Sequence, residues 1–181
     1  ILQLDNNTTG LPVTFIVRGI VSQNTQKDAI AFLKKINHAS GQNYMIGGPE
    51  KVYDFECSAN ETTEYRPFQN SAFTYHTNFP VVNKDYSKLM VEWLKKYGGT
   101  IEETFKCQRF PSFEKRFNKE TKSISIDQVK EVLSSRDNNT PDVISNSNTY
   151  SSIIYKLSGT PEFIIAPGKP HEVDYITIKF E

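Results

Sequence analysis

The amino-acid sequence predicts an α+β fold in which antiparallel sheets are covered by helices. Segments with helical periodicity and segments rich in β-branched and aromatic residues come in blocks, and they do not alternate one by one. Gly-Pro turn signals at 48–50 and 167–170 join neighbouring strands as hairpins. No internal repeat or long linker divides the 181 residues, so we expect one domain over 1–181.

The first block is a pair of segments before residue 40. Residues 13–21 combine β-branched side chains, typical of a strand, with helical apolar spacing and a preceding Pro12, which suits a helix start. These residues alone leave both structures open. Thr25 to Asp28 approaches a capping box, and apolar positions at helical spacing then run to Ile36, which predicts a helix.

The second block is a trio of strands. Residues 42–48 and 51–58 are rich in β-prone side chains on either side of Gly48-Pro49-Glu50, which predicts a hairpin. Residues 71–77 are predicted to form a further strand, because aromatic and threonine residues precede Pro80.

The third block is helical. Residues 86–97 place Leu, Met, Trp and Tyr side chains on one stripe, and Gly98-Gly99 ends it. A helical stretch over about 108–119 follows. Ser125 is a capping residue for a helix that runs through Leu133.

The last block consists of strands after a polar loop. Residues 136–148 are rich in Asn, Asp and Ser and are predicted to form a loop. Three strands are expected after it, at about 149–157, 161–166 and 173–180.

Composition excludes several functions. Basic and acidic residues number 21 each, so the net charge gives no reason to expect a nucleic-acid partner. No run approaches the roughly 20 apolar residues of a membrane span. The two cysteines have neither CxxC nor Cys/His ligand spacing, and P-loop, GxGxxG, HExxH and GxSxG patterns are absent. We therefore expect no metal and no organic cofactor.

The most informative stretch is 73–80, in which His76, Thr77 and Asn78 form a triplet just before Phe79-Pro80. With the two preceding strands, this order resembles the C-terminal half of N-terminal-nucleophile (Ntn) hydrolases of the acyl-coenzyme A:6-aminopenicillanic acid acyltransferase family, which are related to choloylglycine hydrolases. The resemblance runs from Gly10 to the terminal strands. It implies a helix at 13–21 and a four-layer αββα sandwich that lacks its N-terminal strands, so 1–181 would be the C-terminal part of one Ntn-hydrolase-like domain.

The resemblance also implies a chemistry. An amidohydrolase or acyltransferase acts on a linear amide or acyl substrate, and the side-chain amide of Asn78 stabilises the oxyanion, a contribution of about 3–4 kcal/mol. Its nucleophile is a cysteine exposed by autoproteolysis. This chain begins with Ile1, so the nucleophile is expected upstream, and the chain alone is expected to be inactive and to associate with the missing segment or with itself. From Asn78-Phe79-Pro80 alone, a turn residue that bonds its own backbone is the favoured interpretation. The order of the flanking segments, which resembles the family, favours the oxyanion role.

Three further residues join the predicted site. On a strand, His76 would share a face with Asn78, so His76 and Thr77 are expected to shape the substrate pocket, with a structural histidine as the alternative. Arg109 matches the arginine that orients the active centre in this family, although Cys107 stands where the family often has Ser. Arg116 is the competing register, and Arg109 is preferred for its spacing from Ser125.

Other family-like residues are expected to be structural. Arg18 follows an apolar run after Pro12 and needs a partner, for which Asp54 or Glu56 is suited. Asn43 and Glu56 are expected to hold the geometry of the sheet.

Rival hypotheses remain for the function. A Cys–His dyad of Cys57 or Cys107 with His76 is disfavoured, because Cys57 lies in a predicted strand and lacks the helix N-terminus that activates a thiol. A non-catalytic binding or structural protein on the same scaffold is the alternative to an enzyme. A third reading is an unrelated α+β domain in which the triplet is coincidental.

Overall fold

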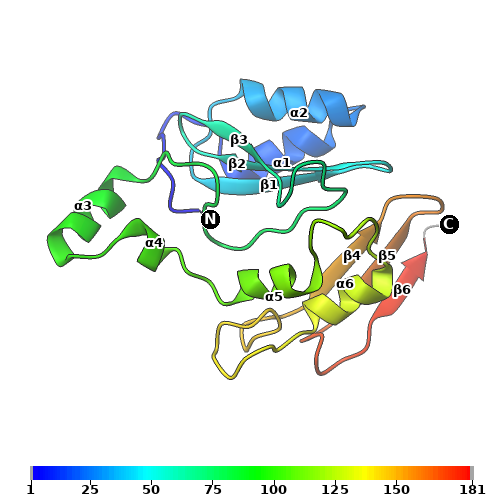
Figure 1. Ribbon diagram of the computed structural model, residues 1–181. Coiled ribbons are helices and arrows are strands. Elements are labelled where there is room, and N and C mark those ends of the chain that lie inside the picture. Colours follow the sequence, from blue (N-terminus) through cyan, green and yellow to red (C-terminus); the bar gives the residue numbers. More distant parts are fainter. Residues whose placement is uncertain (1, 180–181) are drawn as a thin grey trace. The chain divides into compact units, whose positions relative to one another are not determined.

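The computed structural model describes residues 2–179 and has mixed α/β structure with two small antiparallel sheets (Figure 1). The chain divides into two compact units. Unit 1 comprises Ile1–Gly47, Val52–Pro67 and Asn78–Lys106. Unit 2 comprises Gly48–Lys51, Phe68–Thr77 and Cys107–Glu181.

Unit 1 begins with two helices, α1 (Val13–Val21) and α2 (Gln26–Lys35). The helix that the resemblance implied at 13–21 is confirmed, and Pro12 stands at its N-cap. Thr25 caps α2 as predicted. Its hydroxyl oxygen accepts a hydrogen bond from the Asp28 amide at 3.1 Å, and its hydroxyl donates to the Asp28 carboxylate at 2.7 Å.

The sheet of unit 1 has the order β1 (Gln42–Gly47), β2 (Val52–Cys57) and β3 (Thr62–Tyr65), all antiparallel. The predicted hairpin is confirmed. The third strand was predicted in the wrong place, because it lies at Thr62–Tyr65 and residues 71–77 form no strand.

Local hydrogen bonds explain the early return of the chain. The Ser58 hydroxyl oxygen accepts from the backbone N–H groups of Asn60 and Glu61 at 3.4 and 3.0 Å. The Ser58 amide donates to the Glu61 carbonyl at 2.8 Å, which closes a tight turn directly after β2. The β-branched Thr62 and Thr63 can then pair with β2.

Helices α1 and α2 cover one face of this sheet (Figure 1). Alternate strand residues point to this face and pack with the helices in the core: Ile16, Ala29, Leu33, Tyr44, Ile46, Phe55 and Cys57. The intervening residues of β1 and β2 belong to the other face, where Asn43, Asp54 and Glu56 lie. Asp54 and Glu56 are nevertheless buried, at 1% and 0% exposure.

Two more helices follow in unit 1. The predicted helix is confirmed as α3 (Lys88–Tyr97), and Gly98 ends it in the left-handed region at φ 76°. A four-residue helix, α4 (Ile101–Thr104), was not predicted; Thr100 caps it by accepting from the Glu103 amide.

Unit 2 holds α5 (Arg109–Arg116), α6 (Ile126–Leu133) and a sheet of β4 (Ser152–Lys156), β5 (Glu162–Ala166) and β6 (Ile176–Lys179). The predicted helices and strands are confirmed here, and Ser125 forms the full capping box with Gln128. No helix or strand lies between Leu133 and Ser152, in agreement with the predicted loop.

The segment that was expected to be a strand packs through aromatic rings. The ring of Tyr75 stacks on that of Phe113 at 5.1 Å and meets that of Phe110 edge-on at 5.2 Å. Phe73 lies 5.6 Å from Phe117. Side chains of α5 and of Phe117 thus pack on Phe73 and Tyr75 and help to bury Tyr75 without a hydrogen-bonded ladder. This packing explains why a β-prone composition does not give a strand here.

Among residues 2–179, no helix is both long enough and apolar enough to cross a membrane. The same residues contain no group of three or more His, Cys, Asp or Glu side chains that could hold a metal ion.

Candidate functional site

The His-Thr-Asn triplet lies where the chain passes from unit 2 to unit 1, between Thr77 and Asn78. None of its residues is in a strand. The alternation of faces from which we expected His76 and Asn78 to point the same way therefore does not apply.

The three side chains differ in their surroundings. His76 is half-buried, and its Nδ1–H donates to the carbonyl oxygen of Thr77 at 2.6 Å. The Thr77 hydroxyl oxygen is buried and has no hydrogen-bond partner within the described chain. Asn78 is exposed. A half-buried histidine, a threonine with a buried hydroxyl oxygen and an exposed asparagine thus follow one another directly.

The backbone after the triplet is fixed by a buried carboxylate. Glu56 accepts hydrogen bonds from three consecutive amides, those of Val81 at 2.5 Å, Val82 at 2.9 Å and Asn83 at 2.7 Å. Such charge-assisted bonds are stronger than neutral ones. The role expected for Glu56, holding the sheet, therefore extends to the loop that follows Asn78.

The side chain of Asn83 holds the same loop with further hydrogen bonds. It is fully buried, and its amide donates to the backbone carbonyl of Glu56 at 3.1 Å. Its oxygen accepts from the Asp85 amide at 2.9 Å. Sequence reasoning missed Asn83, since an isolated Asn before Lys84-Asp85 reads as an ordinary turn residue.

Arg18 does not form the expected ion pair. Its side chain is exposed on α1 and makes no salt bridge to a described residue, whereas Asp54 and Glu56 are buried on the sheet. The Asp54 carboxylate instead accepts from the side-chain amide of Asn43. An arginine on the exposed face of a helix needs no buried partner, so the prediction for Arg18 was wrong, while Asn43 does bridge β1 and β2.

The two candidate arginines lie at opposite ends of α5. Arg109 is its first residue, and its Nε is 2.7 Å from an Asp142 carboxylate oxygen. Asp142 also accepts from the Gln108 amide at 2.7 Å, so it both pairs with Arg109 and satisfies a donor at the helix start.

Arg116 is the last residue of α5 and is held from several sides. Its Nη1 and Nη2 donate to the two carboxylate oxygens of Asp137 at 2.6 and 2.9 Å, and Nη1 also donates to the Ser112 carbonyl at 3.1 Å. These bonds hold the pKa of the Asp137 carboxyl down at about 2, chiefly through the Arg116 hydrogen bond. Arg116 thus has the contacts of a structural residue.

The chemistry of Cys57 disfavours a nucleophilic role. The side chain is fully buried in β2, and burial raises the pKa of its thiol to about 12, with Glu56 and Asp54 adding to the effect. The thiolate is the reactive form of cysteine, so burial and a raised pKa both make Cys57 a poor nucleophile. Cys107 is partly exposed and lies just before α5.

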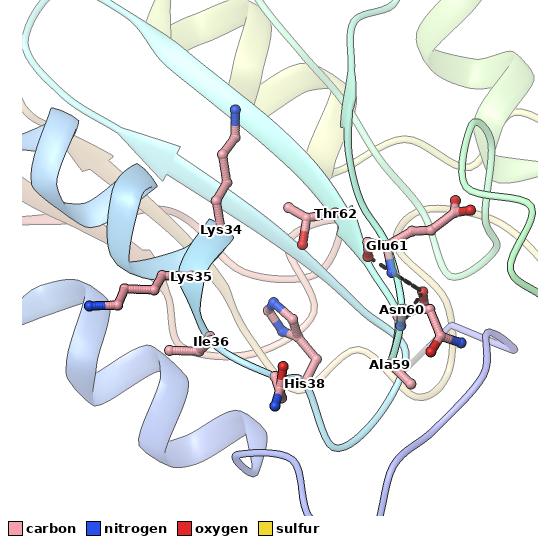
Figure 2. A pocket seen from close by; sticks show the side chains of 10 residues that line it. Lys34, Lys35, Ile36, His38, Ala59, Asn60, Glu61 and Thr62 are labelled. Carbon is pink, nitrogen blue, oxygen red and sulfur yellow. Dashed lines mark hydrogen bonds between the residues drawn. The ribbon is translucent and has the colours of Figure 1, made fainter.

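A polar pocket of about 380 Å³ lies in unit 1 between the end of α2 and the turn after β2 (Figure 2). Figure 2 shows His38 between these walls, while Lys34 and Lys35 extend from the end of α2. His38 is 2% exposed; its Nε2–H donates to the Leu33 carbonyl at 3.1 Å, and burial lowers its pKa. A buried imidazole that bonds one of the last carbonyl groups of a helix is a structural arrangement.

A second pocket, of about 290 Å³, begins at the residue that follows Asn78. Apolar and polar side chains of the loop, Tyr86 and the α4 region line it: Phe79, Pro80, Val81, Lys84, Tyr86, Ile101, Glu102 and Phe105. The rings of Tyr86 and Phe105 stack at 5.7 Å on its wall. All residues that line this pocket belong to unit 1, and none of them is a residue of the triplet.

Comparison with known proteins identifies the family. The family model described as acyl-coenzyme A:6-aminopenicillanic acid acyl-transferase matches residues 2–156, which include α1 to α6, the triplet and both candidate arginines. A search among curated proteins gives no match. The chain therefore belongs to the acyl-coenzyme A:6-aminopenicillanic acid acyl-transferase family.

Proposed function

We propose that this chain carries the oxyanion-stabilising part of an Ntn-type amidohydrolase or acyltransferase that acts on a linear, non-peptide C–N amide. Family membership implies acyl transfer or amide hydrolysis of Ntn type on small molecules. The observation that supports Asn78 as the donor is its exposed position shortly before a loop that is fixed by three hydrogen bonds to Glu56. A donor held in place before the reaction stabilises the transition state most effectively.

The nucleophile is proposed to be a cysteine outside residues 1–181, freed at a new N-terminus by autoproteolysis. Cys57 is excluded from this role by its burial and raised pKa. The thiolate attacks the amide carbonyl carbon, and the carbonyl electron pair moves to oxygen, where Asn78 donates a hydrogen bond. The freed α-amino group has an ordinary pKa near 8, so it can take the thiol proton and pass it to the leaving amine.

The second half of the reaction releases the acyl group. Collapse of the tetrahedral intermediate breaks the C–N bond and leaves a thioester on the cysteine. Water then gives the carboxylic acid, or an amine gives a new amide. Asn78 serves both tetrahedral intermediates, since the negative oxygen forms in the same place each time.

The remaining site residues are assigned supporting roles. His76 and Thr77 are proposed to contact the substrate. Separately, the unit 1 pocket at Phe79 and Tyr86 is proposed to take an apolar substituent. Arg109 is proposed to orient the active centre. Both arginines are paired with a carboxylate, Arg109 with Asp142 and Arg116 with Asp137. Arg109 is preferred over Arg116 for its spacing from Ser125.

For the fold, we propose one Ntn-hydrolase-like domain with the four-layer αββα arrangement, completed by N-terminal strands. The support is local: α1 and α2 cover one face of the first sheet, and its other face carries the buried Asp54 and Glu56. The burial of these carboxylates indicates that this sheet face is covered by other parts of the protein and is not exposed to solvent.

The test uses the complete protein and a series of N-acyl-7-amino-4-methylcoumarin amides with acyl chains from acetyl to palmitoyl. Asn78→Ala is expected to lower kcat by about 10²–10³-fold, as for other oxyanion donors. Asn24→Ala, in the exposed turn between α1 and α2, is the matched control and is expected to leave kcat unchanged. Unchanged turnover in Asn78→Ala would remove the oxyanion assignment and favour a non-catalytic role for this scaffold.

A further inference from the structure

Glu56 is far from the proposed site residues in the sequence, yet its carboxylate binds the loop that follows Asn78. Its carboxylate is fully buried and meets the amides of Val81, Val82 and Asn83. We infer that Glu56 is a positioning residue: it fixes the backbone that sets the direction of the Asn78 amide. This inference rests on the proposed function of Asn78.

The geometry suits a carboxylate and no neutral side chain. Oε1 accepts from Val81, and Oε2 accepts from both Val82 and Asn83, so each of these three bonds is donated by the loop and accepted by Glu56. An ionised carboxylate is an acceptor at both oxygens, whereas an amide side chain presents one acceptor and one donor. Glutamine at this position would turn an N–H group toward backbone N–H groups.

The loop is fastened to the strand as well as to the carboxylate. The Asn83 side-chain amide donates to the Glu56 carbonyl at 3.1 Å, and Glu56 itself lies inside β2, paired with Asn43 and Thr63. The rigid sheet therefore holds both the carboxylate and the loop. A support on a regular element holds a site more precisely than one on a loop.

The connection from this anchor to Asn78 is short. Only Phe79 and Pro80 separate Asn78 from Val81, and Pro80 is buried with a fixed φ near −65°. Adjacent Cα atoms are about 3.8 Å apart, so this short connection leaves few backbone dihedrals to absorb a shift at Val81 before it reaches Asn78. Misplacement of a catalytic group by about 1 Å can cost about 10²-fold in rate.

The test is a double-mutant cycle in the complete protein, with the coumarin amide that the wild type hydrolyses fastest. Glu56→Gln is expected to lower kcat about 10–100-fold with KM changed less than twofold, because the donor is misplaced while the pocket remains. Glu56→Gln combined with Asn78→Ala is expected to be no slower than Asn78→Ala alone, since Glu56 acts only through Asn78.

Phe55→Leu is the matched control, because Phe55 neighbours Glu56 on β2 but packs on the opposite, core face. It is expected to lower the melting temperature without changing kcat. If Glu56→Gln does not fold, Asn83→Ala replaces it, since this change removes the second fastening and leaves the carboxylate intact. The expected kinetic results are the same.

Amide hydrogen exchange tests the position of the loop without an activity measurement. The amides of Val81 to Asn83 are expected to exchange at least tenfold faster in Glu56→Gln than in Phe55→Leu, and unchanged exchange would overturn the inference. Unchanged kcat in Glu56→Gln, or losses that multiply in the double variant, would also overturn it while Asn78 keeps its role. No loss in Asn78→Ala would instead remove the proposed function itself, and with it this role of Glu56.

Discussion

Arg116 and Asp137 form a two-pronged ion pair that ties the end of α5 to the loop after α6, with N–O distances of 2.6 and 2.9 Å. Both side chains are mostly buried, with 20% and 19% of their surface exposed. The pair stabilises the part of unit 2 that carries Arg109, so its contribution can be measured without touching the proposed site.

The Arg116–Asp137 pair predicts a pH-dependent stability. The pKa of Asp137 is lowered from 3.8 to about 2, so the folded state favours its ionised form. The stabilisation is complete above about pH 4 and is lost as pH falls toward 2. Asp137→Asn is expected to cost about 1–2 kcal/mol at pH 7, after allowance for solvent screening. Urea unfolding at pH 7 and pH 2.5 checks this; an equal difference between variant and wild type at both values would contradict it.

His38 predicts a loss of stability at mildly acidic pH. Burial lowers its pKa below the ordinary 6.5, so the unfolded chain binds a proton that the folded chain resists. The stabilisation is therefore fully present above about pH 6.5 and falls as pH decreases below this value. Melting temperatures between pH 5 and 7.5 test this against His38→Gln, whose profile is expected to be flatter. A wild-type profile as flat as that of the variant would show that His38 titrates normally.

The two cysteines are expected to react very differently. Cys57 is buried with a pKa of about 12, and Cys107 is partly exposed. Iodoacetamide at pH 8 is therefore expected to alkylate Cys107 in the native chain and Cys57 only after denaturation, as read by peptide mass spectrometry. Alkylation of native Cys57 at the rate of Cys107 would contradict its buried position in β2.

The core of unit 1 predicts where truncation is costly. Phe55 is 0% exposed between α1, α2 and the sheet, whereas Phe15 on α1 is 63% exposed. Phe55→Ala is expected to lower the free energy of unfolding by about 3–5 kcal/mol. Phe15→Ala is expected to change it by less than about 0.5 kcal/mol. Chemical denaturation of the two variants distinguishes these values, and similar losses would place the core elsewhere.

The features predicted from the sequence are those with local signals. Thr25 and Ser125 start helices through their own neighbours, and the Gly-Pro turn after β1 closes its hairpin within a few residues. The position of the third strand of the first sheet was predicted wrongly, because the packing that decides the structure of residues 71–77 involves residues distant in the sequence. Phe73 and Tyr75 have strand propensity, but rings from α5 and Phe117 give them another way to be buried.

The candidate site could be predicted only in part, again because some of its contacts join residues that are distant in the sequence. Asn78 stands out because the residues around it resemble a family pattern. The bonds from Val81, Val82 and Asn83 to Glu56 are donated by backbone N–H groups, which every residue but proline has. These bonds join residues that are 25–27 positions apart in the chain, so no local sequence pattern predicts them.

The most direct test of the account is the intact mass and N-terminal sequence of the polypeptide made from the complete gene, with and without a thiol alkylator. We predict a mature chain that starts at a cysteine upstream of Ile1 and gains one alkyl group there. A chain that is never cut, with no reactive N-terminal thiol, would contradict the Ntn mechanism and leave Asn78 as an ordinary turn residue.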